Sequence, residues 1–200
     1  MRLTAEVRWF WEGAPPSSFQ EWFVNAGPNW AVLGDCQTRT DEYLVDSSQR
    51  ALGIKKRGGQ EAVEIKGLIE SREATAELAG CVSPIELWAK WLSSALALDS
   101  AALIKVRKRR WMRKFRLVTG AAVECTGSTE ARTSGCDAEL TLLAVDGSAW
   151  WTFGLEAFGD LEQVENDLAV TVAVLADRNP PALPWGEAKS YPRWLASFSG

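Results

Sequence analysis

The chain has no histidine among its 200 residues. This absence excludes histidine-based catalytic triads, histidine metal sites and imidazole acid–base chemistry. Any catalysis would have to use carboxylates, lysine, tyrosine, cysteine or a metal ion held by oxygen ligands. The four cysteines, Cys36, Cys81, Cys125 and Cys136, form no C-x-x-C pair and lack zinc-like spacing. We therefore expect reduced thiols, several of them buried.

Long apolar runs are also missing. No stretch approaches the roughly 20 apolar residues that span a bilayer, and the opening residues MRLTAEVRWFWEG lack the apolar run of a signal peptide. We therefore expect a cytoplasmic protein with no membrane partner. The net charge of −4 and the pI near 5.1 argue against general affinity for nucleic acid. The hydrophobic content of 46% is ordinary for a globular protein. The length fits one domain, or one domain with appendages, and we predict a single domain over residues 1–200.

Alternating apolar and polar residues predict that most of the chain is β-strand. Gly58-Gly59 and Asp146-Gly147 supply hairpin turns, and the polar stretch 127–135 predicts a loop. We expect about eight strands, and an antiparallel sheet of this size usually curls or closes into a barrel. The predicted strands lie at 5–11, 30–33, 38–45, 52–57, 62–68, 104–109 with an extension over 117–124, 136–145 and 149–158.

Two or three helices are predicted beside these strands. The clearest begins at Ser83, where an N-cap serine, Pro84 and Glu86 form a capping box, and it continues to about Leu98. Apolar residues at helical spacing support this helix. A short helix is expected over 18–24, another after an Asp160 cap through 175, and a last helical turn over 191–195.

The most unusual stretch is the run KVRKRRWMRKFR over 105–116, in which eight of twelve residues are Lys or Arg. Alternation along a strand places Lys105, Arg107 and Arg109 on one face. A row of cations on a sheet is costly unless water or an anion lies opposite it. A solvated edge strand is one alternative, and a basic-aromatic patch for single-stranded nucleic acid is another, against which the acidic pI argues.

Charged residues occupy one face of several predicted strands, and apolar residues occupy the other face. This pattern predicts a barrel with a charged, wet interior and an apolar exterior packed under helices. Such an interior would attract a polyanion. The charged set contains seven cations and four anions: Arg8, Lys55, Arg57, Lys66, Lys105, Arg107 and Arg109, with Glu6, Glu64, Glu139 and Glu156.

Several stretches, in order along the chain, resemble the CYTH, or triphosphate tunnel metalloenzyme, superfamily. The resemblance implies an α+β fold: a closed eight-stranded antiparallel tunnel with charged lining and flanking helices. It rests on AEVRWF at the N-terminal strand, DEYLVDS, the basic hairpin LGIKKRGGQEAVEIKGL, the strand IKVRKRR, the late hairpin CDAELTLL with DGSAWWTFGLEAFG, and SYPRWL.

The family hydrolyses, or in a few members cyclises or forms, triphosphates with Mg²⁺ or Mn²⁺. By resemblance, the catalytic and metal-binding candidates are Glu6, Glu139 and Glu156. The phosphate-binding candidates are Lys55, Arg57, Lys66, Lys105, Arg107 and Arg109, with Arg8 as a further contact. The chain departs from the family pattern where Arg8, Phe10 and Phe158 replace two acidic residues and a lysine.

Replacing a carboxylate by arginine beside a metal adds positive charge to a site that must already bind a cation. We therefore expect the protein to bind a triphosphate or another small phosphorylated anion with weak, altered or absent hydrolase activity. One alternative is a metal-dependent triphosphatase. The other is a non-catalytic structural or partner-binding protein whose charges satisfy one another.

Overall fold

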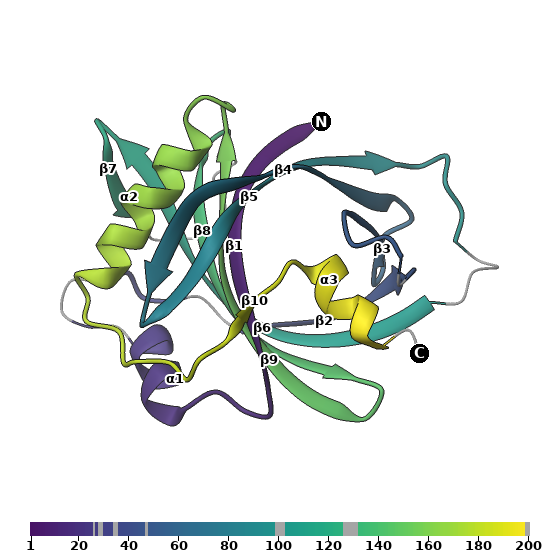
Figure 1. The fold of residues 1–200 in the computed structure, drawn as a ribbon, viewed down its shortest axis with the longest axis horizontal. Coiled ribbons are helices and arrows are strands. Elements are labelled where there is room, and N and C mark those ends of the chain that lie inside the picture. The colour runs from purple at the N-terminus through teal and green to yellow at the C-terminus, as the bar shows by residue number, and fades with distance from the viewer. Residues whose placement is uncertain are drawn as a thin grey trace.

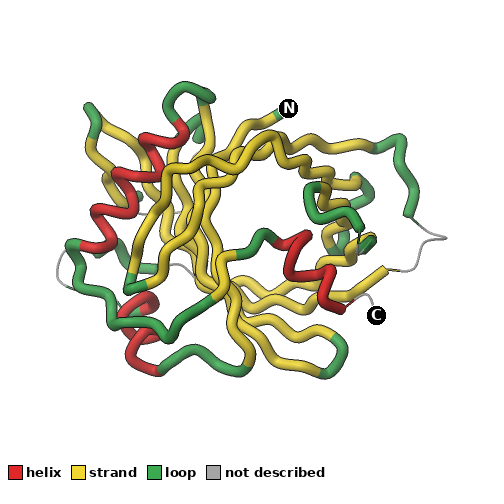
Figure 2. Tube along the Cα trace, in the orientation of Figure 1, coloured by secondary structure: helices red, strands yellow, loops and turns green. Residues whose placement is uncertain are grey.

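A computed structural model describes residues 1–25, 27, 30–33, 36–46, 48–98, 103–125 and 132–198. Most of the predicted 127–135 loop therefore lies outside the described residues. Strands dominate, and the helices are short (Figure 2). The elements are β1 (Arg2–Glu12), α1 (Ser17–Val24), β2 (Gln37–Leu44), β3 (Leu52–Arg57), β4 (Val63–Leu78), β5 (Cys81–Ser93), β6 (Leu103–Val118), β7 (Ala121–Glu124), β8 (Gly135–Val145), β9 (Ser148–Gly159), α2 (Val164–Ala176), β10 (Glu187–Ala188), α3 (Tyr191–Leu195) and a 3₁₀ turn (Ala196–Phe198).

Eight strands close into an antiparallel barrel in the order β1-β5-β4-β3-β2-β6-β8-β9, with β9 returning to pair with β1. Closure is extensive, because the β1–β9 ladder runs from Leu3↔Gly159 to Glu12↔Trp150. Among the described residues β7 pairs with β6 alone, and β10 adds two residues to β1. Figure 1 shows the strands as a ring with α3 inside it. The predicted closed eight-stranded antiparallel barrel with flanking helices is confirmed.

The predicted helix from Ser83 to Leu98 is wrong, because residues 81–93 form β5. The strand pairs with β1 on one side and with β4 on the other, so both edges of its backbone are hydrogen-bonded. Its side chains alternate: Ile85 and Leu87 join the main apolar core, and Trp88 lies on the opposite face. Long-range pairing therefore overrides a local capping signal.

Two other local expectations also differ from the structure. The described residues 30–33 form no strand. The helix after β9 begins at Val164 rather than directly after Asp160, since a turn occupies 161–163. All four cysteines are free thiols, and Cys81 and Cys136 are buried, as expected. No described helix is both long enough and apolar enough to cross a membrane.

The main apolar core lies outside the barrel, between the strands and the helices. Alternate residues of β1, including Val7 and Trp9, point into this core together with Phe19 of α1 and Leu168 of α2. Figure 1 shows α2 lying across the strands at one end of the molecule. With the apolar faces buried beneath the helices, the opposite faces are left for the interior of the barrel.

A second apolar cluster fills part of the barrel interior. α3 supplies Trp194 and Leu195, which pack against inward-facing residues of four strands. The Trp194 ring stacks on Phe10 at 4.7 Å between ring centroids. α3 therefore occupies one region of the interior with aromatic side chains. The cluster is Phe10, Tyr43, Val106, Leu143, Val145, Trp194 and Leu195.

Candidate functional site

The basic strand β6 presents the opposite face to the interior from the one expected. Lys105, Arg107 and Arg109 are exposed, whereas Lys108 and Arg110 are only 3% and 8% exposed. The placement of the first three residues inside the barrel is therefore wrong. Alternation correctly puts the three on one face, but it cannot say which face is inside. Val106 sets which face of β6 lies inside the barrel, because it packs into the interior cluster beneath α3.

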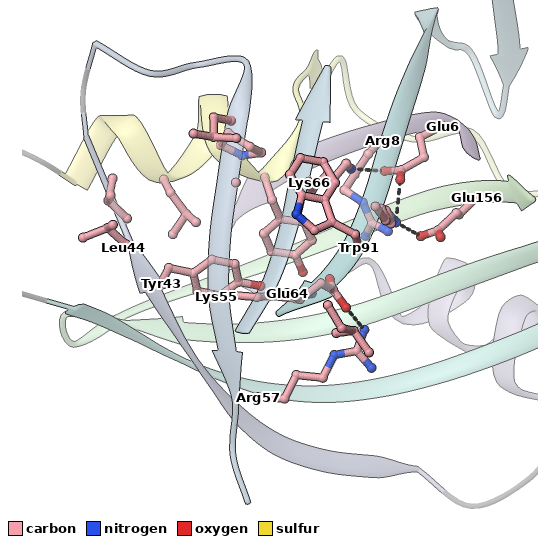
Figure 3. Close-up of a pocket in the computed structure, with 18 of the residues that line it drawn as sticks. Glu6, Arg8, Tyr43, Leu44, Lys55, Arg57, Glu64, Lys66, Trp91 and Glu156 are labelled. Carbon is pink, nitrogen blue, oxygen red and sulfur yellow. Dashed lines mark hydrogen bonds and ion pairs between the residues drawn. The ribbon is translucent and has the colours of Figure 1, made fainter. Parts of the chain in front are cut away.

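A cavity of about 730 Å³ occupies the charged part of the barrel interior. Among the described residues that line it, nine are Lys or Arg and five are Asp or Glu, an excess of four cations. Figure 3 shows several of these side chains, including Glu6, Glu64 and Lys66, converging from different strands. The cations are Arg2, Arg8, Arg39, Lys55, Arg57, Lys66, Lys90, Lys108 and Arg110, and the carboxylates are Glu6, Asp46, Glu64, Glu139 and Glu156.

Seven of the ten residues predicted from the sequence line this cavity. They come from β1, β3, β4, β8 and β9, which the barrel brings together from across the chain. The three that do not are Lys105, Arg107 and Arg109, and Lys105 instead pairs with Glu42 at 3.4 Å on the outer surface. The seven are Glu6, Arg8, Lys55, Arg57, Lys66, Glu139 and Glu156.

The first charge cluster is centred on Glu6. Lys66 donates to one oxygen of Glu6 (Figure 3), and Lys90 lies 2.7 Å from the other oxygen. Lys90 also pairs with Glu156 at 2.7 Å, so one ammonium bridges two carboxylates. Burial alone would raise the pKa of Glu6, but the charges of Lys66 and Lys90 outweigh it and hold that pKa well below its ordinary value.

The second cluster is centred on Glu139. Arg110 Nη2 lies 2.6 Å from Glu139 Oε2, and Arg8 Nη1 donates to Oε1 at 3.3 Å. Thr141 Oγ1 also donates to Oε1 at 2.8 Å. Burial opposes ionisation, yet these two guanidinium groups keep the pKa of Glu139 well below its ordinary value. Arg8, at a position where the resemblance leads us to expect an acid, thus pairs with a carboxylate that the same resemblance leads us to expect as a metal ligand.

The third cluster joins β3 to β4. Glu64 lies 2.8 Å from Lys55 Nζ and 2.5 Å from Arg57 Nη2 (Figure 3). Burial would raise the pKa of Glu64, but the two cations lower it to about 2. Burial lowers the pKa of Lys55, with a smaller opposing effect from Glu64. Glu64 is therefore ionised, whereas burial disfavours the charged form of Lys55.

The sequence reasoning missed several charged residues of the site, among them Asp41, Lys90, Lys108 and Arg110. Asp41, on β2, is fully buried and is contacted by Lys108 at 3.1 Å and Arg39 at 3.0 Å. Lys90 lies in the segment predicted as a helix, and Lys108 and Arg110 lie in the basic run but outside the predicted row of Lys105, Arg107 and Arg109. The Asp41-x-Tyr43 pattern was a usable signal, since it placed two polar side chains on one face of a strand.

The expected Mg²⁺ or Mn²⁺ ligands do not fit a metal site. The oxygens of Glu6 and Glu139 are engaged by lysine or arginine, and Lys90 engages Glu156. In the part of the chain that is described, no group of three Asp, Glu, Cys or His is arranged to hold a metal ion. Mg²⁺ needs several oxygens in near-octahedral geometry, and here each of the three candidate acids would have to exchange a protein cation for it.

Comparison with known proteins gives no family assignment. No family model matches the chain, and no curated protein matches it in sequence. The site must therefore be interpreted from its own geometry.

Proposed function

We propose that the cavity binds a small phosphorylated anion, with a triphosphate as the best match, and that it does so without efficient metal-dependent hydrolysis. The observation that carries this proposal is the excess of four cations among the charged residues lining a cavity of about 730 Å³. That volume falls within the range of ordinary small-molecule sites, roughly 300–1,000 Å³. A polyphosphate would neutralise the excess with a single ligand.

The state of Lys66 is consistent with an anionic ligand. Burial lowers the pKa of Lys66 to about 8, even though Glu6 is bonded to it. Desolvation is the main cause of this shift, and the positive charge of Lys90 adds to it against the opposing effect of Glu6. A bound polyphosphate would supply the missing negative charge and favour the ammonium form of Lys66.

The arginines support phosphate recognition in particular. The Nε atoms of Arg57 and Arg110 are buried and have no hydrogen-bond partner, and both side chains line the cavity. A buried unpaired donor is costly, and the planar guanidinium group matches the geometry of phosphate oxygens. A small shift of either side chain towards the cavity would let these donors meet a ligand, whereas the nearby carboxylate oxygens already have partners. The resemblance to the triphosphate tunnel superfamily points to the same ligand class.

Calorimetry with tripolyphosphate and with ATP, each with and without Mg²⁺, tests this proposal. We expect tripolyphosphate to bind without Mg²⁺, and we expect affinity to fall as salt screens the charges. We also expect phosphate release to stay near the uncatalysed rate with Mg²⁺ or Mn²⁺ present. Absence of binding to either anion at low salt would contradict the proposal.

A second candidate is a structural or partner-binding role without a small-molecule ligand. It is favoured by one observation: the carboxylates Glu6, Glu64, Glu139 and Glu156 each have a lysine or arginine partner. Charges paired in this way can fix the barrel interior without any ligand. Under this candidate neither anion binds, so the same calorimetry separates the two.

A further inference from the structure

The cavity leaves the basic row of β6, formed by Lys105, Arg107 and Arg109, without a role. All three side chains are exposed on the outer face of the barrel. Figure 1 shows α1 and α2 at the opposite end of the molecule from the first residues of β6. The basic row therefore lies on a part of the outer wall where it can meet another molecule.

Protection of a sheet edge does not explain the basic row. Exposed cations often block the pairing of an edge strand with a second chain. Here, however, β6 pairs with β2 along the whole row and with β8 from Arg107 onwards. The backbone of β6 therefore presents no open edge at Arg107 or Arg109, and the alternative of a solvated edge strand is wrong.

The basic row has little negative charge beside it. Glu42 of β2 lies 3.4 Å from Lys105, at one end of the row. Among the described residues, neither Arg107 nor Arg109 has a carboxylate partner, and Arg109 Nε instead lies 3.3 Å from Cys36 Sγ. Two exposed guanidinium groups are thus available to an anion from outside.

The side chains that flank the two arginines are short and uncharged. Arg107 lies between Thr40 of β2 and Ala144 of β8, and Arg109 lies beside Thr38 of β2. Threonine and alanine are much shorter than arginine, so they leave room above the strands on both sides of the row. An extended chain could therefore lie along β6 and contact the cations in turn.

The spacing of the basic row matches a particular kind of chain. Its members are two residues apart on one strand, which separates their Cα atoms by about 6.6–6.8 Å. In an extended peptide the side chains on one face recur at the same interval, so acidic residues at every second position would repeat in step with the row. Each carboxylate could then meet one cation, and arginine can bind a carboxylate through two parallel hydrogen bonds.

A single strand of nucleic acid matches the basic row less well. Proteins that bind such strands combine cations with exposed aromatic rings on which the bases stack. Trp111 is the next residue on this face of β6, but it is only 6% exposed and belongs to the main apolar core. The net charge of −4 would also repel a polyanion that extends beyond the row.

We propose that the outer face of β2 and β6 docks an extended acidic segment of a partner protein, in which Asp or Glu occupies every second position. The carboxylates of the segment pair with Lys105, Arg107 and Arg109, and its backbone runs along β6. Exposed ion pairs are individually weak and are screened by salt, so the affinity is modest and salt-sensitive. Because this face points away from the cavity, the inference does not depend on the proposed function.

Fluorescence anisotropy with a labelled peptide of alternating Glu and Ser tests this inference on the full-length protein. The control peptide has the same composition with all its Glu residues in one block. In an extended block, half of the carboxylates point away from the row. We expect the alternating peptide to bind about threefold more tightly or better, and we expect added salt to weaken its binding.

Three matched substitutions locate the bound peptide. Arg107→Gln and Arg109→Gln each remove one charge from the basic row and should weaken binding by about threefold. Arg116→Gln removes the same charge from an exposed position on the opposite face of β6 and should leave the affinity unchanged. Urea unfolding confirms that the variants are folded before their affinities are compared.

The same assay tests the competing occupants of this face. Preference for the alternating peptide, with losses in Arg107→Gln and Arg109→Gln but not in Arg116→Gln, supports the inference. Tighter binding of oligothymidylate of equal charge, or of vesicles that contain phosphatidylserine, would overturn the acidic segment as the partner. Equal binding of the two peptides, equal losses in all three variants, or no binding at low salt would also overturn it.

Discussion

Substitution of Glu139 by Gln should weaken the fold and tighten anion binding at the same time. The change keeps the shape of the side chain and removes a buried negative charge that pairs with Arg8 and Arg110. Removing one partner of a buried pair costs roughly 3–5 kcal/mol. Because Glu139 is 15% exposed and the amide can still accept from Thr141, we expect a smaller loss, about 2 kcal/mol in the free energy of unfolding.

The gain in affinity follows from Coulomb's law. Two unit charges 4 Å apart interact by about 4 kcal/mol at an effective dielectric constant of about 20. At roughly twice that separation the repulsion between the Glu139 carboxylate and a bound anion is about 2 kcal/mol. Removing it, and freeing Arg8 and Arg110 to contact the ligand, should tighten tripolyphosphate binding by about tenfold or more.

Urea unfolding and calorimetry measure the two effects in one preparation. Glu42→Gln is the matched control, since Glu42 lies on the outer face and pairs with the exposed Lys105 at 3.4 Å. Glu42→Gln should change the free energy of unfolding by no more than about 0.5 kcal/mol and leave the affinity for tripolyphosphate unchanged. A loss of affinity in Glu139→Gln would refute this reasoning, because it would mean that the carboxylate assists the ligand, as a metal-binding acid does.

Three further predictions concern pH, proton exchange and a structural cluster. The pKa of Glu64 falls from 4.5 to about 2 on folding, so its contribution is present above pH 4.5 and is lost as the pH falls towards 2. Between pH 4.5 and 2, the free energy of unfolding measured in urea should fall by about 3 kcal/mol more for the unmodified protein than for Glu64→Gln. The same fall in both proteins would contradict the pairing of Glu64 with Lys55 and Arg57. Because the pKa of Lys66 is about 8, tripolyphosphate binding near pH 8 should take up protons. Calorimetry in buffers of different ionisation enthalpy detects this uptake, and its absence in the unmodified protein would count against the cationic lining. Arg113 is 1% exposed, pairs with Glu124 at 2.5 Å and donates to the Phe23 carbonyl at 2.8 Å. Arg113→Met should therefore lower the free energy of unfolding in urea by about 3 kcal/mol and leave the affinity for tripolyphosphate unchanged. A fall in affinity would contradict this, because it would mean that the Arg113 cluster and the cavity are coupled.

Much of the barrel could be predicted from the sequence because its strands alternate between apolar and charged residues. Val7 and Trp9 point to the outer core, while Glu6 and Arg8 line the cavity, as the period of two requires. The same reasoning placed Lys55 and Lys66 correctly. In these strands one face is clearly apolar, so the pattern itself says which face is buried under helices.

The basic strand β6 could not be oriented in this way. Both of its faces carry cations over residues 105–110, and only Val106 breaks the symmetry. The orientation follows from contacts with α3, which is more than 80 residues further along the chain. A pattern within one strand does not contain that information.

β5 was missed for a different reason. Ser83, Pro84 and Glu86 satisfy the local rules for a helix start, but none of these rules weighs the hydrogen bonds that β1 and β4 provide. The error hid Lys90, which bridges Glu6 and Glu156. Assignment of that segment to a strand would have placed Glu86, Trp88 and Lys90 together on the inner face.

The neighbouring residues Arg109 and Arg110 offer the most direct test of the central claim, that the charged interior of the barrel binds a phosphorylated anion. Arg110 lines the cavity, and Arg109 lies on the exposed outer face of the same strand. Calorimetry with tripolyphosphate should show binding that Arg110→Gln weakens about tenfold or more and that Arg109→Gln leaves unchanged. Equal losses in the two variants, or no binding to the unmodified protein, would contradict the account.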